Sequence, residues 1–137
     1  MRIYTSNGEL HREDGPAVEW DDGTTSWYLN GKLHREYGPA VESPDGYTAW
    51  YLNGKRHRED GPAAEYADGV KAWCINGELH REDGPAYCNT ESMLHGFKMW
   101  YKNGELHRED GPTIEYCKLI SFLNIINRII YWFKSRK

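Results

Sequence analysis

A ten-residue pattern, Asn-Gly-x-x-His-Arg-Glu-x-Gly-Pro, occurs five times in this chain of 137 residues. The copies begin at Asn7, Asn30, Asn53, Asn76 and Asn103, at intervals of 23, 23, 23 and 27 residues. Self-similarity at a fixed period of about 20–50 residues is typical of repeat architectures, in which each unit buries its apolar face against its neighbours. The sequence therefore predicts one repeat array over residues 1–117.

Each unit of the array has the pattern of a β-hairpin. Residues 24–29 alternate with period two, which predicts a strand, and Asn30-Gly31 predicts a sharp reversal because both residues tolerate a positive φ. Gly38-Pro39 ends the following loop, and residues 40–43 predict a second short strand. Two strands in 23 residues leave no room for a helix. We therefore expect an all-β fold, an elongated antiparallel sheet of stacked hairpins.

The composition predicts an aromatic core. Leu, Ile and Val are scarce, whereas the chain holds six Trp and ten Tyr. One tryptophan stands three residues before each of the last four Asn-Gly pairs, and Tyr4 takes that place before the first pair. Stacking the units places these rings in a row, and each ring can bury about 150–250 Å². The structural residues expected to fill the core are Trp27, Trp50, Trp73 and Trp100.

The charge is unevenly distributed along the chain. The net charge is −4, with an excess of five positive charges in residues 118–137 and of nine negative charges in residues 1–117. An acidic array argues against nucleic acid as a partner. Three Cys residues with no Cys-x-x-Cys pair are typical of a reducing compartment, so we expect a cytoplasmic location.

The pattern Asp-Gly-x-x-x-Trp-Tyr-x-Asn-Gly-Lys-x-His, at residues 45–57, resembles the MORN repeat and its bacterial and viral variants. The resemblance covers about residues 2–117, and Arg-Glu-Asp-Gly-Pro-Ala replaces the usual stretch after the His. It implies an elongated, curved antiparallel sheet. It also implies a role in protein interaction, in scaffolding near a membrane or, as in some bacterial variants, as an antitoxin-like protein.

The five histidines of the pattern occupy one equivalent position, which argues against a metal site. Ligands of one zinc ion lie about 2.0–2.1 Å from it, whereas equivalent residues of stacked hairpins are about 9.6 Å apart. We expect these histidines to be structural, and the Arg-Glu pairs beside them to form ion pairs within or between units. No arrangement of nucleophile, base and oxyanion donors is apparent either. The sequence therefore predicts no metal, no cofactor and no enzymatic activity.

Departures from the repeat are the candidate partner-binding residues. Tyr37 replaces the usual Asp and Arg56 the usual Leu, and the fourth unit is four residues longer. A longer loop on a rigid scaffold often carries function, and exposed aromatic and Arg residues are common binding anchors. The complete candidate set is Tyr37, Arg56, Met93, Leu94, His95 and Phe97. His95 with Cys88 and Glu91 could suggest a Cys/His dyad, but nothing in the sequence supplies a third orienting group.

The last twenty residues, 118–137, follow a different pattern. An amphipathic helix is predicted from apolar residues at helical spacing, namely Leu119, Phe122, Ile126, Ile129 and Phe133. Residues 118–133 would reach about 24 Å as a helix, which is short of a membrane core of about 30 Å. Three uses of this basic segment remain open: it caps the last hairpin, it forms a homodimer, or it binds a membrane surface.

These observations favour a non-enzymatic protein-binding module, of the kind that acts as a stoichiometric inhibitor, an antitoxin-like protein or a counter-defence protein in host–virus interaction. Two alternatives are a membrane-associated scaffold that uses residues 118–137 and a binder of small ligands such as nucleotides.

Overall fold

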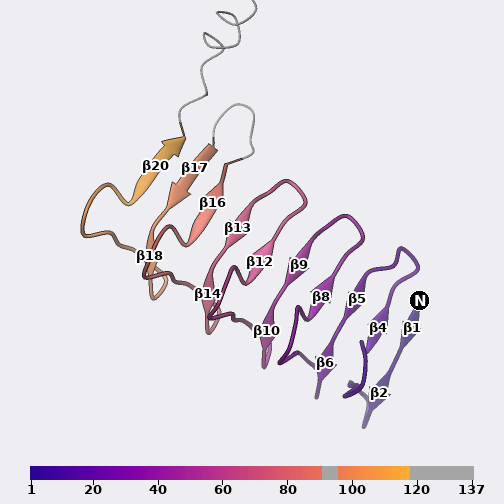
Figure 1. Ribbon diagram of the computed structural model, residues 1–137. Helices are drawn as coiled ribbons and strands as arrows, with labels where there is room; N and C mark the ends of the chain where they lie inside the picture. The colour runs from indigo at the N-terminus through magenta and orange to yellow at the C-terminus, as the bar shows by residue number, and fades with distance from the viewer. Residues whose placement is uncertain (91–95, 118–137) are drawn as a thin grey trace, which may run out of the picture.

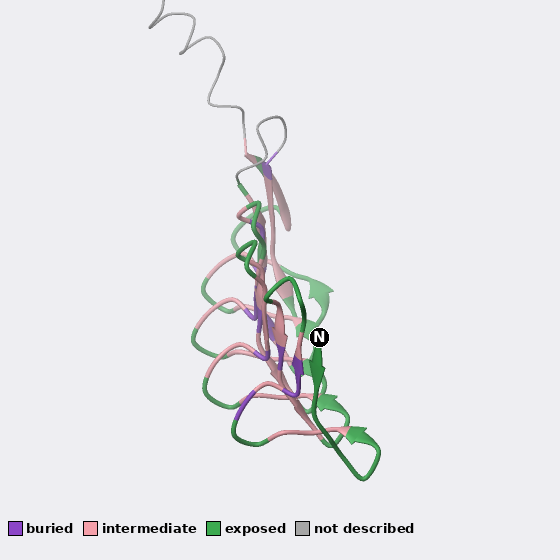
Figure 2. Cartoon of the chain, turned by 90° about the vertical axis from the view of Figure 1, so that its right-hand side faces the viewer, coloured by how far each residue is buried: buried purple, intermediate pink, exposed green. Residues whose placement is uncertain are grey.

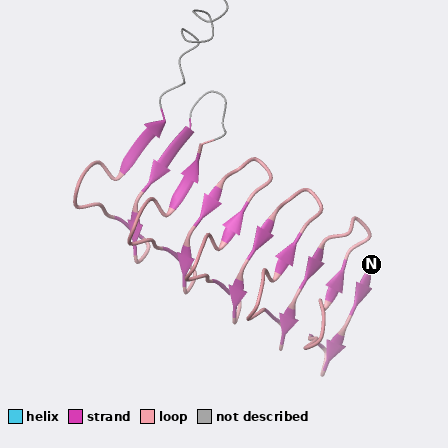
Figure 3. Ribbon diagram, in the orientation of Figure 1, coloured by secondary structure: helices cyan, strands magenta, loops and turns pink. Residues whose placement is uncertain are grey.

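The computed structural model describes residues 1–90 and 96–117, which are all-β and contain no helix (Figures 1 and 3). The predicted helix, with Leu119, Phe122, Ile126, Ile129 and Phe133, lies outside the described residues. So do the candidate residues Met93, Leu94 and His95. The predicted all-β array of antiparallel hairpins is confirmed for the part of the chain that the structure describes.

Ten strands form the main sheet, in the order β1-β4-β5-β8-β9-β12-β13-β16-β17-β20. Every pair of neighbours is antiparallel, and each later strand adds to the same growing edge (Figure 1). The strands are β1 (Arg2–Ile3), β4 (Val18–Glu19), β5 (Thr25–Ser26), β8 (Val41–Glu42), β9 (Thr48–Ala49), β12 (Ala64–Glu65), β13 (Lys71–Ala72), β16 (Tyr87–Asn89), β17 (Gly96–Met99) and β20 (Ile114–Cys117).

Five small hairpins lie in a row along one edge of the main sheet (Figure 1). They are β2 (Thr5–Ser6) with β3 (Glu9–Leu10), β6 (Tyr28–Leu29) with β7 (Lys32–Leu33), β10 (Tyr51–Leu52) with β11 (Lys55–Arg56), β14 (Cys74–Ile75) with β15 (Glu78–Leu79), and β18 (Tyr101–Lys102) with β19 (Glu105–Leu106). Each turn is Asn-Gly, with φ of 50–52° at the Asn and 71–93° at the Gly. Positive φ at both central residues defines a type I′ turn, so the predicted reversal is confirmed.

The predicted strand over residues 24–29 is divided at Trp27 into β5 and β6. The Trp27 N–H donates to the carbonyl of Ala40 at 2.7 Å, whereas the Trp27 carbonyl accepts from the N–H of His34 at 3.0 Å. The chain therefore changes its pairing partner at the tryptophan, from the main sheet to the small hairpin. The same exchange occurs at Trp50, Trp73 and Trp100.

Consecutive hairpins are linked directly. The N–H of Gly31 donates to the carbonyl of Leu10 in the preceding unit at 2.9 Å, and Gly54, Gly77 and Gly104 make the equivalent bond at 2.8–2.9 Å. The hairpins are thus fixed to one another as well as to the main sheet.

The core is made of small residues, which corrects the prediction that the tryptophan row fills it. Trp27, Trp50, Trp73 and Trp100 are only half-buried. The buried residues are Ala17, Val18, Ser26, Ala40, Ala49, Ala63, Ala64, Val70, Ala72, Cys74 and Ala86, together with two glycines, Gly15 and Gly96. The sheet is a single layer from which loops stand out on one face (Figure 2). No second layer of strands covers the tryptophan rings among the described residues.

Candidate functional site

The loops that follow the small hairpins cover the tryptophan face of the sheet. We call them the loop row: residues 12–16, 35–39, 58–62, 81–85 and 108–112, numbered here as the first to the fifth loop. Each begins with an arginine whose guanidinium lies over the aromatic ring eight residues earlier. The distances from Cζ to the ring centroid are 4.1 Å for Arg12 on Tyr4, 4.1 Å for Arg35 on Trp27, 4.0 Å for Arg58 on Trp50, 4.2 Å for Arg81 on Trp73 and 4.0 Å for Arg108 on Trp100.

This stack is the main feature that the sequence analysis missed. A cation over an aromatic face is attracted by the ring quadrupole and contributes about 0.5–2 kcal/mol, depending on desolvation. The constant spacing of eight residues between ring and arginine was the available signal. The arginines do form ion pairs, but with residues other than the glutamate beside them: Arg12 bonds Glu19 at 3.4 Å and Arg35 bonds Glu42 at 3.1 Å, whereas Glu13 faces His11.

Each arginine also closes its own loop. In the first, third, fourth and fifth loops the Nε–H donates to the Asp two residues later, at 2.7–3.0 Å. A terminal nitrogen donates to the carbonyl of the loop proline at 3.0–3.5 Å in all five loops. Because the guanidinium is held by a ring on one side and by loop acceptors along its edge, the loop has a defined shape.

The four loop aspartates are stabilised as carboxylates by the arginine of the same loop. The hydrogen bond from the arginine, and then its charge, holds the pKa of these four groups below the ordinary value of 3.8. They are Asp14, Asp60, Asp83 and Asp110.

We expect acid to remove this contribution. A carboxylate whose folded-state pKa is depressed stabilises the fold above its unfolded-state pKa, and that stability is lost as pH falls through the folded-state value. Asp60→Asn should therefore lower the free energy of unfolding at pH 6, and its difference from wild type should narrow below about pH 4. Urea unfolding of the variant and of wild type, at pH 6 and again below about pH 4, measures this difference in the free energy of unfolding. An equal difference at both would show that the charge of Asp60 does not stabilise the loop.

The repeated histidines connect one unit to the next. The Nδ1 of His11 lies 2.9 Å from Oδ1 of Asn30 and accepts the Asn30 N–H at 3.2 Å. His34, His57 and His80 make the same contacts with the next turn asparagine. These contacts have the structural role expected of the repeated histidines, because each one ties a unit to the next turn. Within residues 1–90 and 96–117, no group of three or more His, Cys, Asp or Glu is arranged to hold a metal ion.

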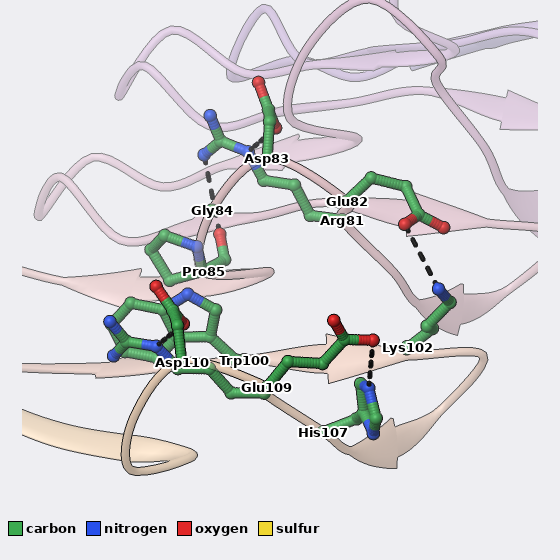
Figure 4. Close-up of a pocket in the computed structure, with 11 residues that line it drawn as sticks. Arg81, Glu82, Asp83, Gly84, Pro85, Trp100, Lys102, His107, Glu109 and Asp110 are labelled. Carbon is green, nitrogen blue, oxygen red and sulfur yellow. Dashed lines mark hydrogen bonds and ion pairs between the residues drawn. The ribbon is translucent and has the colours of Figure 1, made fainter.

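The outer surface of the loop row is dominated by carboxylates. The Glu and Asp side chains of the first, third, fourth and fifth loops are 66–86% exposed. Hollows lie between neighbouring loops: about 570 Å³ between the fourth and fifth, and about 520 Å³ between the second and third. In the first of these, Lys102 bonds Glu82 at 3.2 Å and His107 faces Glu109 at 3.8 Å (Figure 4).

Tyr37 marks the second loop as different. Its side chain is 90% exposed, and it lines the hollow between the second and third loops. In this position it replaces the aspartate that the other four loops carry.

The opposite face of the sheet carries a group of tyrosines around Arg56. Its Nε donates to the hydroxyl of Tyr51 at 3.0 Å and its Nη2 to that of Tyr47 at 3.2 Å, and Tyr47 packs against Tyr66 with ring centroids 5.0 Å apart. Burial by itself would lower the pKa of Arg56, but the Tyr51 hydroxyl and the surrounding phenols raise it above its ordinary value. Burial raises the pKa of Tyr47.

The structure therefore separates the predicted partner-binding residues. Tyr37 stands on the loop row, whereas Arg56 bonds the tyrosines of the opposite face. Phe97 stacks on Tyr87 at 5.6 Å on that same opposite face. The sequence did not reveal this division, because the hairpin pattern does not determine over which face the loops fold.

Comparison of the chain with models of protein families, with curated proteins and with solved structures finds no match. Residues 1–90 and 96–117 contain no helix, and hence none that is long and apolar enough to cross a membrane.

Proposed function

We propose that this chain is a non-enzymatic protein-binding module of the MORN-variant type, which acts as a stoichiometric inhibitor of a partner protein through its loop row. The observation that carries the proposal is the repetition of one rigid loop, closed by the same arginine stack, along one face of an extended sheet. An antitoxin-like or counter-defence role in the cytoplasm is one setting for such a binder.

Pre-organisation supports this proposal. A loop that is already ordered loses little conformational entropy when a partner binds, so more of the contact energy appears as affinity. Equivalent loops along one face also engage a partner at several points at once, which raises the overall affinity above that of any single contact.

Charge indicates the kind of partner surface. The loop row holds nine carboxylates and five arginines. The arginine side chains are less exposed than the carboxylates. Their exposed fraction is 16–26% for Arg12, Arg35, Arg58, Arg81 and Arg108. A partner surface with lysine and arginine side chains is complementary to this arrangement. Such complementarity speeds association and fixes the relative position of two proteins.

Two matched variants test the proposal. The first replaces three loop-row glutamates, Glu36, Glu59 and Glu82, with glutamine. The second makes the same change at three exposed glutamates of the small hairpins, Glu9, Glu78 and Glu105. Both remove three negative charges, so a non-specific charge effect would appear equally in both.

The partner is first captured from host lysate on immobilised wild-type protein, and its affinity is then measured with purified components. We expect at least tenfold weaker binding for the loop-row variant, with an unchanged melting temperature, and no change for the hairpin variant. If the loop-row variant binds as tightly as wild type, the loop row is not the recognition surface and the proposal fails.

A further inference from the structure

The second loop lacks the carboxylate that closes the other four. There the arginine Nε–H donates to an aspartate at 2.7–3.0 Å, but Tyr37 occupies this place in the second loop. Arg35 keeps its other bonds, from Nη1 to the carbonyl of Pro39 at 3.0 Å and to Glu42 at 3.1 Å. Its Nε–H has no acceptor within residues 1–90 and 96–117.

The first loop is a matched comparison for this site. Arg12 and Arg35 both lie 4.1 Å above an aromatic ring, both donate to the loop proline, and both bond a glutamate of the next strand. The two arginines are also equally exposed, at 26%. The loops differ in one acceptor, the carboxylate of Asp14 on the Nε of Arg12, and in the backbone at the loop glycine, where Gly38 but not Gly15 has a positive φ, of 139°.

The free Nε–H of Arg35 is not fully buried, and the Arg35 side chain as a whole is 26% exposed. Among the described residues, no buried side-chain nitrogen or oxygen lacks a hydrogen-bond partner, so this unpartnered nitrogen is not a buried one. Guanidinium groups form their strongest hydrogen bonds with ionised acceptors such as carboxylates and phosphates. The first loop shows that a carboxylate fits at this edge of a guanidinium that is already stacked and bonded in the same way.

Neighbouring acidic groups do not prevent a carboxylate from binding here. Glu36, Glu59 and Asp60 line the same hollow as Arg35 and Tyr37, together with the ring of His57 and the guanidinium of Arg58. Asp60 bonds Arg58 at 2.8 Å, so its carboxylate has a partner, and Glu59 faces the His57 ring at 3.7 Å. In the first loop Asp14 is accommodated beside Glu13, as an incoming carboxylate would be beside Glu36.

We infer that the second loop is a binding site for a carboxylate carried by the partner protein, an Asp or Glu side chain that completes the loop from outside by accepting the Nε–H of Arg35. The exposed ring of Tyr37 then contacts an apolar residue beside that acidic side chain. This inference rests on the proposed function and adds to it. One acidic residue within a basic partner surface would meet the one loop that lacks an aspartate, and this would fix the position of the partner along the array.

The test uses NMR on the arginine Nε–H signals of the full chain. The probes are two short peptides, acetyl-Leu-Asp-Leu-amide and, as a matched control, acetyl-Leu-Asn-Leu-amide. We expect the Asp peptide at millimolar concentration to shift the Arg35 signal saturably. The signals of Arg12, Arg58, Arg81 and Arg108 should stay in place, because their Nε–H groups are already bonded. The Asn peptide should bind at least tenfold more weakly.

Three variants test whether the NMR response depends on an arginine Nε–H without an acceptor in its own loop. Tyr37→Asp supplies the missing carboxylate from within the loop and should abolish the response. Tyr37→Phe keeps the ring and the open site and should preserve it. Asp14→Tyr opens the first loop and should make Arg12 respond like Arg35. The inference is overturned if the Arg35 signal does not move, if all five arginines move alike, or if Tyr37→Asp still responds.

The same variants separate this inference from the proposed function. If Tyr37→Asp binds the captured partner like wild type while the loop-row glutamate variant does not, the loop row recognises its partner without a carboxylate on Arg35. The proposed function then stands and the inference fails. If both variants lose affinity and Tyr37→Phe does not, both are supported.

Discussion

Replacement of Trp50 by alanine is expected to lower the free energy of unfolding by about 3 kcal/mol, the lower end of the range for loss of a large aromatic side chain. The ring is half-buried rather than fully buried, which argues against the upper end. It supports the guanidinium of Arg58 at 4.0 Å, so its loss also removes the contact that holds the third loop against the sheet. Urea unfolding followed by far-UV circular dichroism measures the change.

Trp20 is the matched control for this substitution. It is 49% exposed and belongs to an Asp-Gly turn outside the stacked row. Trp20→Ala removes the same atoms but should cost less than about 1 kcal/mol, as expected for a surface position. Equal losses at Trp20 and Trp50 would mean that the stacked row does not stabilise the array more than an exposed tryptophan does.

Gly61→Ala is expected to cost about 1–3 kcal/mol, although it adds a single methyl group. A Cβ at this position would lie 2.8 Å from the Cζ of Arg58, so the guanidinium must leave its place over Trp50. The displacement would also break its bonds to Asp60 and to the carbonyl of Pro62. Thermal unfolding of the variant and of wild type gives the size of the effect.

A double-mutant cycle identifies the cause of that loss. In an Arg58→Ala background the added methyl group meets no guanidinium, so Gly61→Ala should be neutral or slightly stabilising. If the two substitutions are instead additive, the glycine is required for a reason other than the arginine above it.

The sheet and its turns could be predicted because they depend on local residue chemistry. Asn and Gly adopt positive φ whatever surrounds them, and all five Asn-Gly turns do so. The 23-residue period then requires antiparallel pairing between units, as observed from β1 to β20. These inferences needed no knowledge of which face of the sheet is covered.

The core and the candidate site depended on knowledge that the sequence does not supply. A row of tryptophans predicts a buried core only if a second layer covers it, whereas here the cover is a row of arginines. Ala40 and Ala63, completely buried in the structure, have side chains too small to suggest a core. Tyr37 matters because it leaves the Nε–H of Arg35 without an acceptor. This is apparent only when the loops are compared in space.

The register of the main sheet has a consequence for how such a chain can change in length. The fourth unit is four residues longer than the others, yet β16 and β17 pair Tyr87 with Met99, just as β4 and β5 pair the equivalent Val18 with Ser26. Growth at the Asp-Gly end of a unit thus leaves the loop row undisturbed, and gain or loss of whole units changes only the number of loops. Evolution can therefore vary the reach of the molecule by duplication, and a protein engineer can insert a label at that end without altering the opposite edge.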